Sequence, residues 1–242
     1  MKHSSLRLFG ALAAVSLAGG LSSCVAPAGG PPCVDVPFFV GNPPTPPAPI
    51  PAGWYTSDTR TNGTSAINTD LGNPPGLSCK SVKLTTGATT ASPSQDKAQL
   101  FTFDALGTAL SSVNTVSYWA YRSSLSPAVV ANPNVAATTA FNVQVTGASV
   151  PGNNFTTLVY EPYLQAGGNA AIINDTWQQW NASSGLWWST KVGQGTYYTW
   201  AQLQTLYPGA TVAGYGFNLG SFNPNLIVGG DGIVFGATTT DF

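Results

Sequence analysis

Short β-rich runs separated by turn residues fill the chain from Gly53 to Phe242, and they constrain its fold more than any other feature. Runs this short, bounded by Gly, Pro, Asn or Ser, are typical of antiparallel strands in a sandwich or barrel. We therefore predict an all-β fold, an antiparallel β-sandwich of the jelly-roll type. The predicted strands are Ser81–Thr86, Ala98–Asp104, Thr115–Ser123, Ala140–Gly147, Thr156–Leu164, Thr176–Ala182, Leu186–Lys191, Thr211–Gly220 and Gly232–Thr238.

One short helix is predicted over Thr199–Gly209. Thr199 is suited to accept a hydrogen bond from the first turn, and Gln202 is placed to return one, which is the pattern of a capping box. Pro208 ends the run because proline cannot continue a helix. We expect this helix to close one end of the sandwich.

The start of the chain reads as an export signal. Lys2 and Arg7 precede an apolar, uncharged run over Leu8–Leu21, which is shorter than the roughly 20 residues of a membrane span. The following "LSSC", which ends at Cys24, resembles the lipobox of bacterial lipoproteins. The resemblance implies cleavage before Cys24, a signal peptide over 1–23, a lipid on the Cys24 sulfur, and an exported protein anchored to a membrane surface of the cell envelope. The alternative is an ordinary signal peptide cut nearby.

Cysteine usage fits this interpretation. The chain has 3 cysteines, so a lipid on Cys24 leaves Cys33 and Cys79 as a pair. Export reaches an oxidising compartment in which disulfides persist. We predict a Cys33–Cys79 disulfide, and the alternative is two separate thiols.

Proline divides the remainder of the chain into two parts. Residues 24–52 are dense in proline, as in "NPPTPPAPIP", which indicates a semi-rigid spacer of polyproline type. Residues 53–242 form the predicted β-sandwich domain.

Charge and histidine content exclude several functions. Only 7% of residues are charged, so no basic patch forms and nucleic acid is excluded as a partner. The 1 histidine of the chain, His3, lies in the predicted signal peptide. The mature chain would then lack a Ser-His-Asp triad, a histidine metal ligand and an imidazole base. Glu161 is the only glutamate, so the paired glutamates of many glycosidases are absent. We predict that the protein is not an enzyme.

Strand parity assigns side chains to faces, because neighbouring residues in a strand point to opposite sides. In Ala140–Gly147, parity predicts a core face of Phe141, Val143 and Val145 and a polar face of Asn142, Gln144 and Thr146. In Leu186–Lys191, Trp187 shares a side with Lys191, and lysine rarely points into a core. We therefore predict Trp187 outward and Trp188 buried. Glu161 and Tyr163 share a predicted outer face. Trp177 and Trp180 fall on opposite sides of their run, and parity does not say which is inside.

Outward aromatic rings beside amide and hydroxyl side chains suit sugar rings, whose C–H faces pack on indole. The predicted ligand-binding residues are Trp187, Tyr163, Glu161 and Trp180. The alternative is that the tryptophans are covered by the spacer or the helix.

Four segments carry a wider resemblance. "GWYTSDTR", "TTLVYEPYL", "DTWQQWNASSGLWWSTK" and "YTWAQLQTLYPGATVAGYGFNLGSFNPNLIVGGDGIVFG" resemble a bacterial exported domain type, over about Gly53–Phe242. Such domains resemble jelly-roll sandwiches of the carbohydrate-binding-module or lectin-like kind. The resemblance implies this fold and carries no catalytic residue.

Asp231, in "VGGDGIVFG", is a candidate calcium ligand, because calcium takes oxygen ligands from loops. The alternative is a turn-forming aspartate between glycines. No other cofactor is expected.

Together these features predict a non-catalytic, lipid-anchored surface domain that binds an extracellular polysaccharide or envelope polymer. A structural envelope protein without a small ligand is the alternative, and a glycan hydrolase is a remote one.

The lipid anchor is testable by substitution. We expect Cys24→Ala to release the protein from membranes, because the thioether carries the lipid chains. Membrane fractionation measures the release. An intact, unlipidated Cys24 in the mass spectrum of the mature protein would contradict the prediction.

Overall fold

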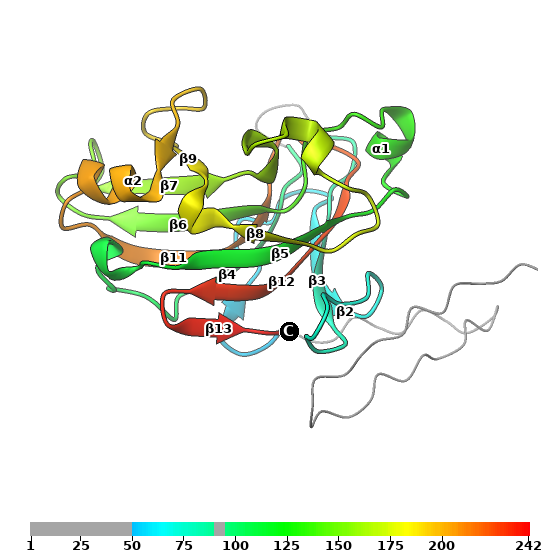
Figure 1. Ribbon diagram of the computed structural model, residues 1–242, viewed down its shortest axis with the longest axis horizontal. Coiled ribbons are helices and arrows are strands. Elements are labelled where there is room, and N and C mark those ends of the chain that lie inside the picture. The colour runs from blue at the N-terminus through cyan, green and yellow to red at the C-terminus, as the bar shows by residue number, and fades with distance from the viewer. Residues whose placement is uncertain (1–49, 90–94) are drawn as a thin grey trace, which may run out of the picture.

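In the computed structural model, which describes residues 50–89 and 95–242, two antiparallel β-sheets pack face to face (Figure 1). The predicted sandwich is confirmed. In spatial order, the seven-stranded sheet comprises β1 (Trp54–Tyr55), β4 (Ala98–Thr102), β11 (Thr211–Leu219), β6 (Ala140–Thr146), β7 (Phe155–Tyr160), β9 (Leu186–Ser189) and β10 (Tyr198–Thr199). The six-stranded sheet comprises β2 (Thr64–Asn68), β3 (Ser81–Thr85), β12 (Ile227–Phe235), β5 (Val116–Arg122) and β8 (Gln178–Asn181), with β13 (Thr238–Thr240) paired to β12.

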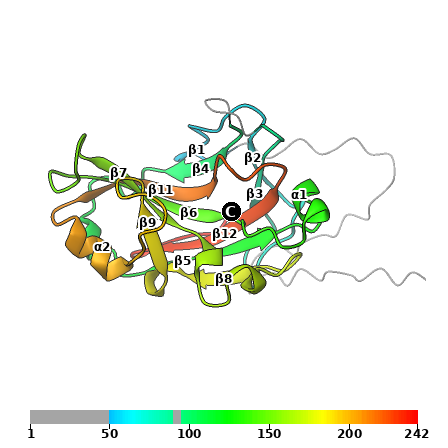
Figure 2. The ribbon, with the colours of Figure 1, turned by 90° about the horizontal axis from the view of Figure 1, so that it is seen from above.

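Two α-helices lie at opposite ends of the sandwich (Figures 1 and 2). The predicted helix is α2 (Trp200–Leu206), and its capping box is present: Gln202 N donates to Thr199 Oγ1 and Thr199 N donates to Gln202 Oε1. The other, α1 (Pro127–Ala131), was not predicted. Short 3₁₀ helices span Leu110–Ser112, Pro162–Leu164, Gly168–Ala171 and Ala182–Ser184.

The chain crosses repeatedly between the two layers, which Figure 2 shows from above. β3 and β5 belong to one sheet and β4 to the other, and β11 and β12 also lie in different sheets. Strand β11 therefore pairs with β4 and β6, both distant in sequence. Such non-local pairing is typical of jelly-roll sandwiches.

Aromatic rings from both sheets fill the core. Tyr118 of β5 stacks on Phe141 of β6 with ring centres 5.3 Å apart, and Tyr215 of β11 stacks on Phe235 of β12 at 4.1 Å. Burial of each such ring contributes roughly 1.5–3 kcal/mol. In β6 the predicted alternation is confirmed, since Phe141 and its i+2 and i+4 neighbours join the core.

The start of the described chain already belongs to the sandwich. Ile50, in the predicted spacer, packs against the core, and Trp54 N donates to Pro51 O. Residues 1–49 lie outside the described residues, so lipidation of Cys24 and the Cys33–Cys79 pairing stay predictions. Within the described part, no helix is long and apolar enough to cross a membrane.

Asp231 lies in the middle of strand β12, so the predicted loop or turn position was wrong. β12 pairs with β3 as far as Gly230 and with β13 from Ile233, and Asp231 sits at this junction. Its side chain is fully buried, and Oδ1 accepts hydrogen bonds from the backbone N–H groups of Gly232 and Phe242.

Calcium binding at Asp231 stays a prediction. Its Oδ2 has no hydrogen-bond partner among the described residues. In the same part of the chain, no group of three or more His, Cys, Asp or Glu side chains comes together. Burial raises the pKa of Asp231 to about 7.

This burial makes stability depend on pH. The folded-state pKa of Asp231 is about 7 and its ordinary value is 3.8. A carboxyl group whose pKa is higher in the folded state than in the unfolded state stabilises the fold fully at pH values below its unfolded-state pKa. That stabilisation is lost as pH rises through its folded-state pKa. As pH rises from about 4 to about 7, we expect the free energy of unfolding of the unaltered protein to fall by roughly 2–4 kcal/mol relative to that of Asp231→Asn.

Urea unfolding of both proteins across that pH range measures the difference. Parallel pH profiles for the two proteins would contradict the prediction.

Candidate functional site

A groove of about 410 Å³ runs along the outer face of the seven-stranded sheet. The residues that matter for its chemistry come from strands β6, β7, β9 and β11 and from the loops beyond them. They are Asn142, Val159, Glu161, Trp188, Asn218 and Phe222. The groove lies outside the sandwich because the alternate residues of the same strands fill the core.

Strand register aligns part of the groove in one row. Gly216 pairs with Asn142, Asn142 with Val159, and Val159 with Trp188. Paired residues of antiparallel strands project from the same face. Neighbouring strands are about 4.8 Å apart, so Trp188 lies about 14 Å across the sheet from Gly216.

Two glycines leave the β11 side of this face without protruding side chains. A Cβ at Gly216 would lie 2.1 Å from the backbone oxygen of Leu100, so no side chain fits there. A Cβ at Gly214 would lie 3.0 Å from the ring of Phe103. Larger residues on β11 would displace β4 or Phe103.

Two asparagines in the groove have uncommitted amides. Asn142 and Asn218 are 6% and 7% exposed, and the side-chain oxygen of each is buried without a partner. Asn218 lies two residues from the register partner of Asn142, so the two are diagonal neighbours on one face. An unpaired buried polar group costs about 1–3 kcal/mol. Among the described residues, no hydrogen bond offsets this cost.

The β9 side of the groove carries the carboxylate of Glu161. Its Oε2 accepts hydrogen bonds from Trp188 Nε1 at 2.9 Å, from Tyr163 Oη at 3.1 Å and from Gln194 Nε2 at 3.2 Å. Its Oε1 has no hydrogen-bond partner in the described part of the chain. Burial raises the pKa of Glu161, and the three hydrogen bonds offset that rise only in part.

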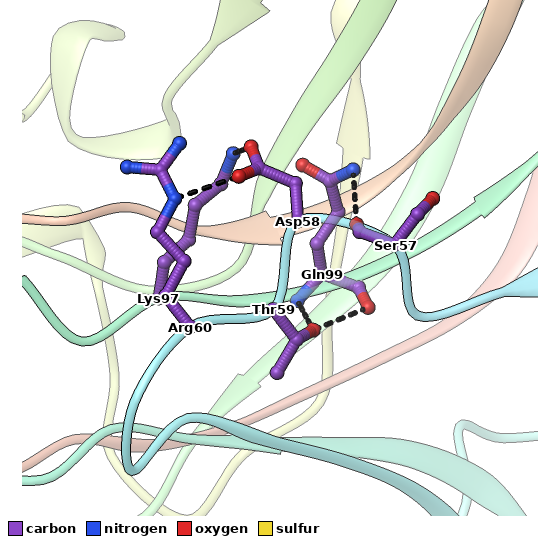
Figure 3. Close-up of polar contacts among 6 residues, drawn as sticks. All are labelled: Ser57, Asp58, Thr59, Arg60, Lys97 and Gln99. Carbon is purple, nitrogen blue, oxygen red and sulfur yellow. Dashed lines mark hydrogen bonds and ion pairs between the residues drawn. The ribbon is translucent and has the colours of Figure 1, made fainter. Parts of the chain in front are cut away.

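Lys97 lines the opposite side of the groove and is held by a polar cluster (Figure 3). Its Nζ lies 2.5 Å from Asp58 Oδ2, while Arg60 Nε lies 2.6 Å from Asp58 Oδ1. Burial lowers the pKa of Lys97, and the adjacent Asp58 carboxylate acts in the other direction. Arg60 and Lys97 therefore share the single carboxylate of Asp58, and the cluster carries a net charge of +1.

Gln99 attaches this cluster to strand β4. Its Nε2 donates to Ser57 O, and its backbone N–H and C=O both bond Thr59 Oγ1 (Figure 3). The loop that carries Asp58 is thus fixed against the sheet beside the groove.

The predicted outer face of Glu161 and Tyr163 is where the structure places them, since both line the groove. Their role in binding stays a prediction. Trp180 does not line this groove. It lies on β8 of the other sheet, where it pairs with Tyr118 of β5 and packs against the core, and its role in binding stays a prediction.

The orientation of the adjacent tryptophans was also predicted wrongly. Trp187 is fully buried, where it contacts Tyr160 and Trp200, and its Nε1 donates to Ala182 O at 2.8 Å. Trp188 points outward into the groove. The parity argument relied on Lys191, but β9 ends at Ser189. A lysine in the turn beyond the strand does not report the strand's faces.

Phe222 is a groove residue that sequence reasoning missed. It is 77% exposed and lies in the loop between β11 and β12. The signal available in the sequence was a single bulky ring among turn residues in "GSFNPN". Such a ring has no strand parity to assign it.

No protein-family model matches the chain. No curated protein matches it either. Two solved structures show distant likeness. One is an arabinose-bound α-L-arabinofuranosidase, with a TM-score of 0.39 and 11% identity, and the match covers 76% of this chain and 22% of that chain. The other is an exo-β-agarase, with a TM-score of 0.38 and 14% identity, and the match covers 80% of this chain and 24% of that chain. The chain thus spans less than a quarter of either chain. Likeness at this level carries no information on activity.

The burial of Trp187 predicts opposite effects for the two adjacent tryptophans. We expect Trp187→Ala to destabilise the fold by about 3–5 kcal/mol, because it empties a core site. Trp188→Ala removes a partly exposed ring and serves as the matched control, for which we expect a much smaller loss. Urea unfolding of both variants measures this. A larger loss for Trp188→Ala would show that the inside and outside positions are the reverse.

Proposed function

We propose that the protein is a non-catalytic glycan-binding domain and that its ligand lies in the groove of the seven-stranded sheet. One observation carries the proposal: two asparagines whose amides make no hydrogen bond within the described residues line a groove that also presents aromatic rings. An amide offers both a donor and an acceptor, and a sugar hydroxyl offers the same pair.

The division of roles follows from the chemistry of each side chain. Asn142 and Asn218 would bond adjacent ring hydroxyls and so gain the partners they lack. Trp188 and Phe222 would supply apolar surface for the C–H face of a sugar ring. The groove volume of about 410 Å³ lies within the range of small-ligand sites.

The proposed ligand is bound without chemistry. Glycosidases use two carboxyl groups on either side of the scissile bond. Glu161 is the only carboxylate among the described residues that line this groove. This composition supports binding over hydrolysis.

At the seven-stranded sheet, which carries the groove, edge geometry favours ligand binding over strand addition by a partner. In the described part, the seven-stranded sheet ends in β1 and β10, which are two residues each. Short edges limit strand addition by another chain, so the sheet offers little to an assembly.

The location of the domain is part of the same proposal. The "LSSC" motif supports a lipid on Cys24, and the Pro-rich residues 24–52 support a spacer. Together they would hold the sandwich near a membrane surface of the cell envelope, where extracellular polymers are the available ligands.

Phe222 tests the proposal directly. We expect Phe222→Ala to weaken glycan binding by about tenfold and to leave the melting temperature unchanged, because the ring is exposed and packs on little else. The ligand is found first with a glycan array, and calorimetry then measures the variant. Leu125→Ala is the matched control, since Leu125 is equally exposed at 77% and does not line the groove.

Equal affinity for both variants would place the site elsewhere. An array on which the folded protein binds no glycan would contradict the proposal itself.

A further inference from the structure

The carboxylate of Glu161 is a negative charge without a cation. The described ion pairs join Asp58 to Arg60 and Lys97, and Asp70 to Lys83, and none includes Glu161. The three groups that bond its Oε2 are an indole, a phenol and an amide, all neutral donors. Desolvating a carboxylate without an opposite charge is costly, so the folded chain alone gains little from ionised Glu161 at this position.

The three hydrogen bonds orient the carboxylate. All of them fall on Oε2, and they come from Trp188 on β9, from Tyr163 and from Gln194. Oε1 is left for a ligand, and an ionised carboxylate oxygen only accepts. The ligand atom that meets Oε1 must therefore be a donor.

The nearest cationic side chain in the groove does not supply this charge. Lys97 is paired with Asp58 and directly precedes β4, which is separated from β7 by β11 and β6 and lies about 14 Å from β7 across the sheet. Trp188, beside Glu161, adds an aromatic face that also attracts cations. This side of the groove therefore favours a positively charged group over a neutral one.

We propose that the groove recognises an amino-substituted glycan, in which a protonated primary amine on a sugar ring pairs with Oε1 of Glu161. The inference rests on the proposed glycan-binding function and names its substrate class. Ring hydroxyls meet Asn142 and Asn218, while the ammonium meets the carboxylate. Acidic sugars are disfavoured, because their carboxylates approach the like charge of Glu161.

The test compares two probes that differ only in the amine. One is a tetramer of β-1,4-linked glucosamine, and the other is the tetramer of β-1,4-linked glucose, which has a neutral hydroxyl in place of every amine. Calorimetry is performed at about pH 6, at which an amine of this type is protonated. We expect the free-amine tetramer to bind at least about tenfold more tightly, as a charged hydrogen bond would give.

Variants assign the preference to Glu161. We expect Glu161→Gln to bind the two tetramers with equal affinity. Asp70→Asn is the matched control, because it removes one negative charge from an exposed ion pair outside the groove, and it should keep the full preference. If Glu161→Gln does not fold, the preference of the unaltered protein and its weakening by added salt still decide the question.

Several outcomes overturn the inference. Equal affinity of the unaltered protein for both tetramers would do so, as would a preference that survives in Glu161→Gln. So would calcium alone binding at Glu161 and displacing the amine, because the missing cation would then be a metal. In each case a neutral glycan that binds and depends on Phe222 would leave the proposed function intact.

Discussion

Burial of the Trp187 indole is the interaction on which both the core and the groove depend. Its ring centre lies 5.4 Å from that of Tyr160 and 4.7 Å from that of Trp200, so it joins β9 to β7 and to helix α2. Its Nε1 donates to Ala182 O, so the polar atom of the ring is satisfied inside the core. Because neighbouring strand residues face opposite ways, this burial directs Trp188 outward, where its own N–H reaches Glu161. The packing of one ring thereby places the next one in the groove.

Strand β11 serves the two faces of the sheet in the same alternating manner. Tyr215, Phe217 and Leu219 are buried in the core, and the residues that directly precede each of them face the groove side. Those outward positions hold Gly214, Gly216 and Asn218, which give the groove its low side and one of its free amides. The aromatic side chains of the inner face supply the burial free energy that allows an unpaired amide on the outer one.

Local patterns were enough to predict most of the fold. All nine predicted runs overlap strands, and the capping box of α2 is present, because both signals lie in a few consecutive residues. Four strands were not predicted. β1 and β10 have only two residues each, and β2 and β13, which each pair along one side only, are polar and lack an apolar pattern. The site was less predictable. Polar alternation was enough to predict that Asn142 points outward. The absence of a partner for its amide depends on the pairing of β6 with β11, about 70 residues away in the chain, and a local pattern does not report that pairing. The reversed assignment of Trp187 and Trp188 has a similar cause, since a pattern of residue types does not show where a strand ends.

The low charge of the chain leaves selectivity in the proposed site to direct contacts. With 7% charged residues, the protein has little long-range field to attract a ligand, so discrimination has to come from contact. A buried amide is well suited to this, because a ligand that lacks the matching hydroxyl leaves the amide unpaired and loses the corresponding free energy. Asn142 and Asn218 would read the positions of hydroxyls in this way, and the rings of Trp188 and Phe222 would accept many sugars that present a flat apolar face. In the proposed site, aromatic contact therefore sets the affinity for sugar rings in general, and the amides together with Glu161 set which substituents a ring must carry.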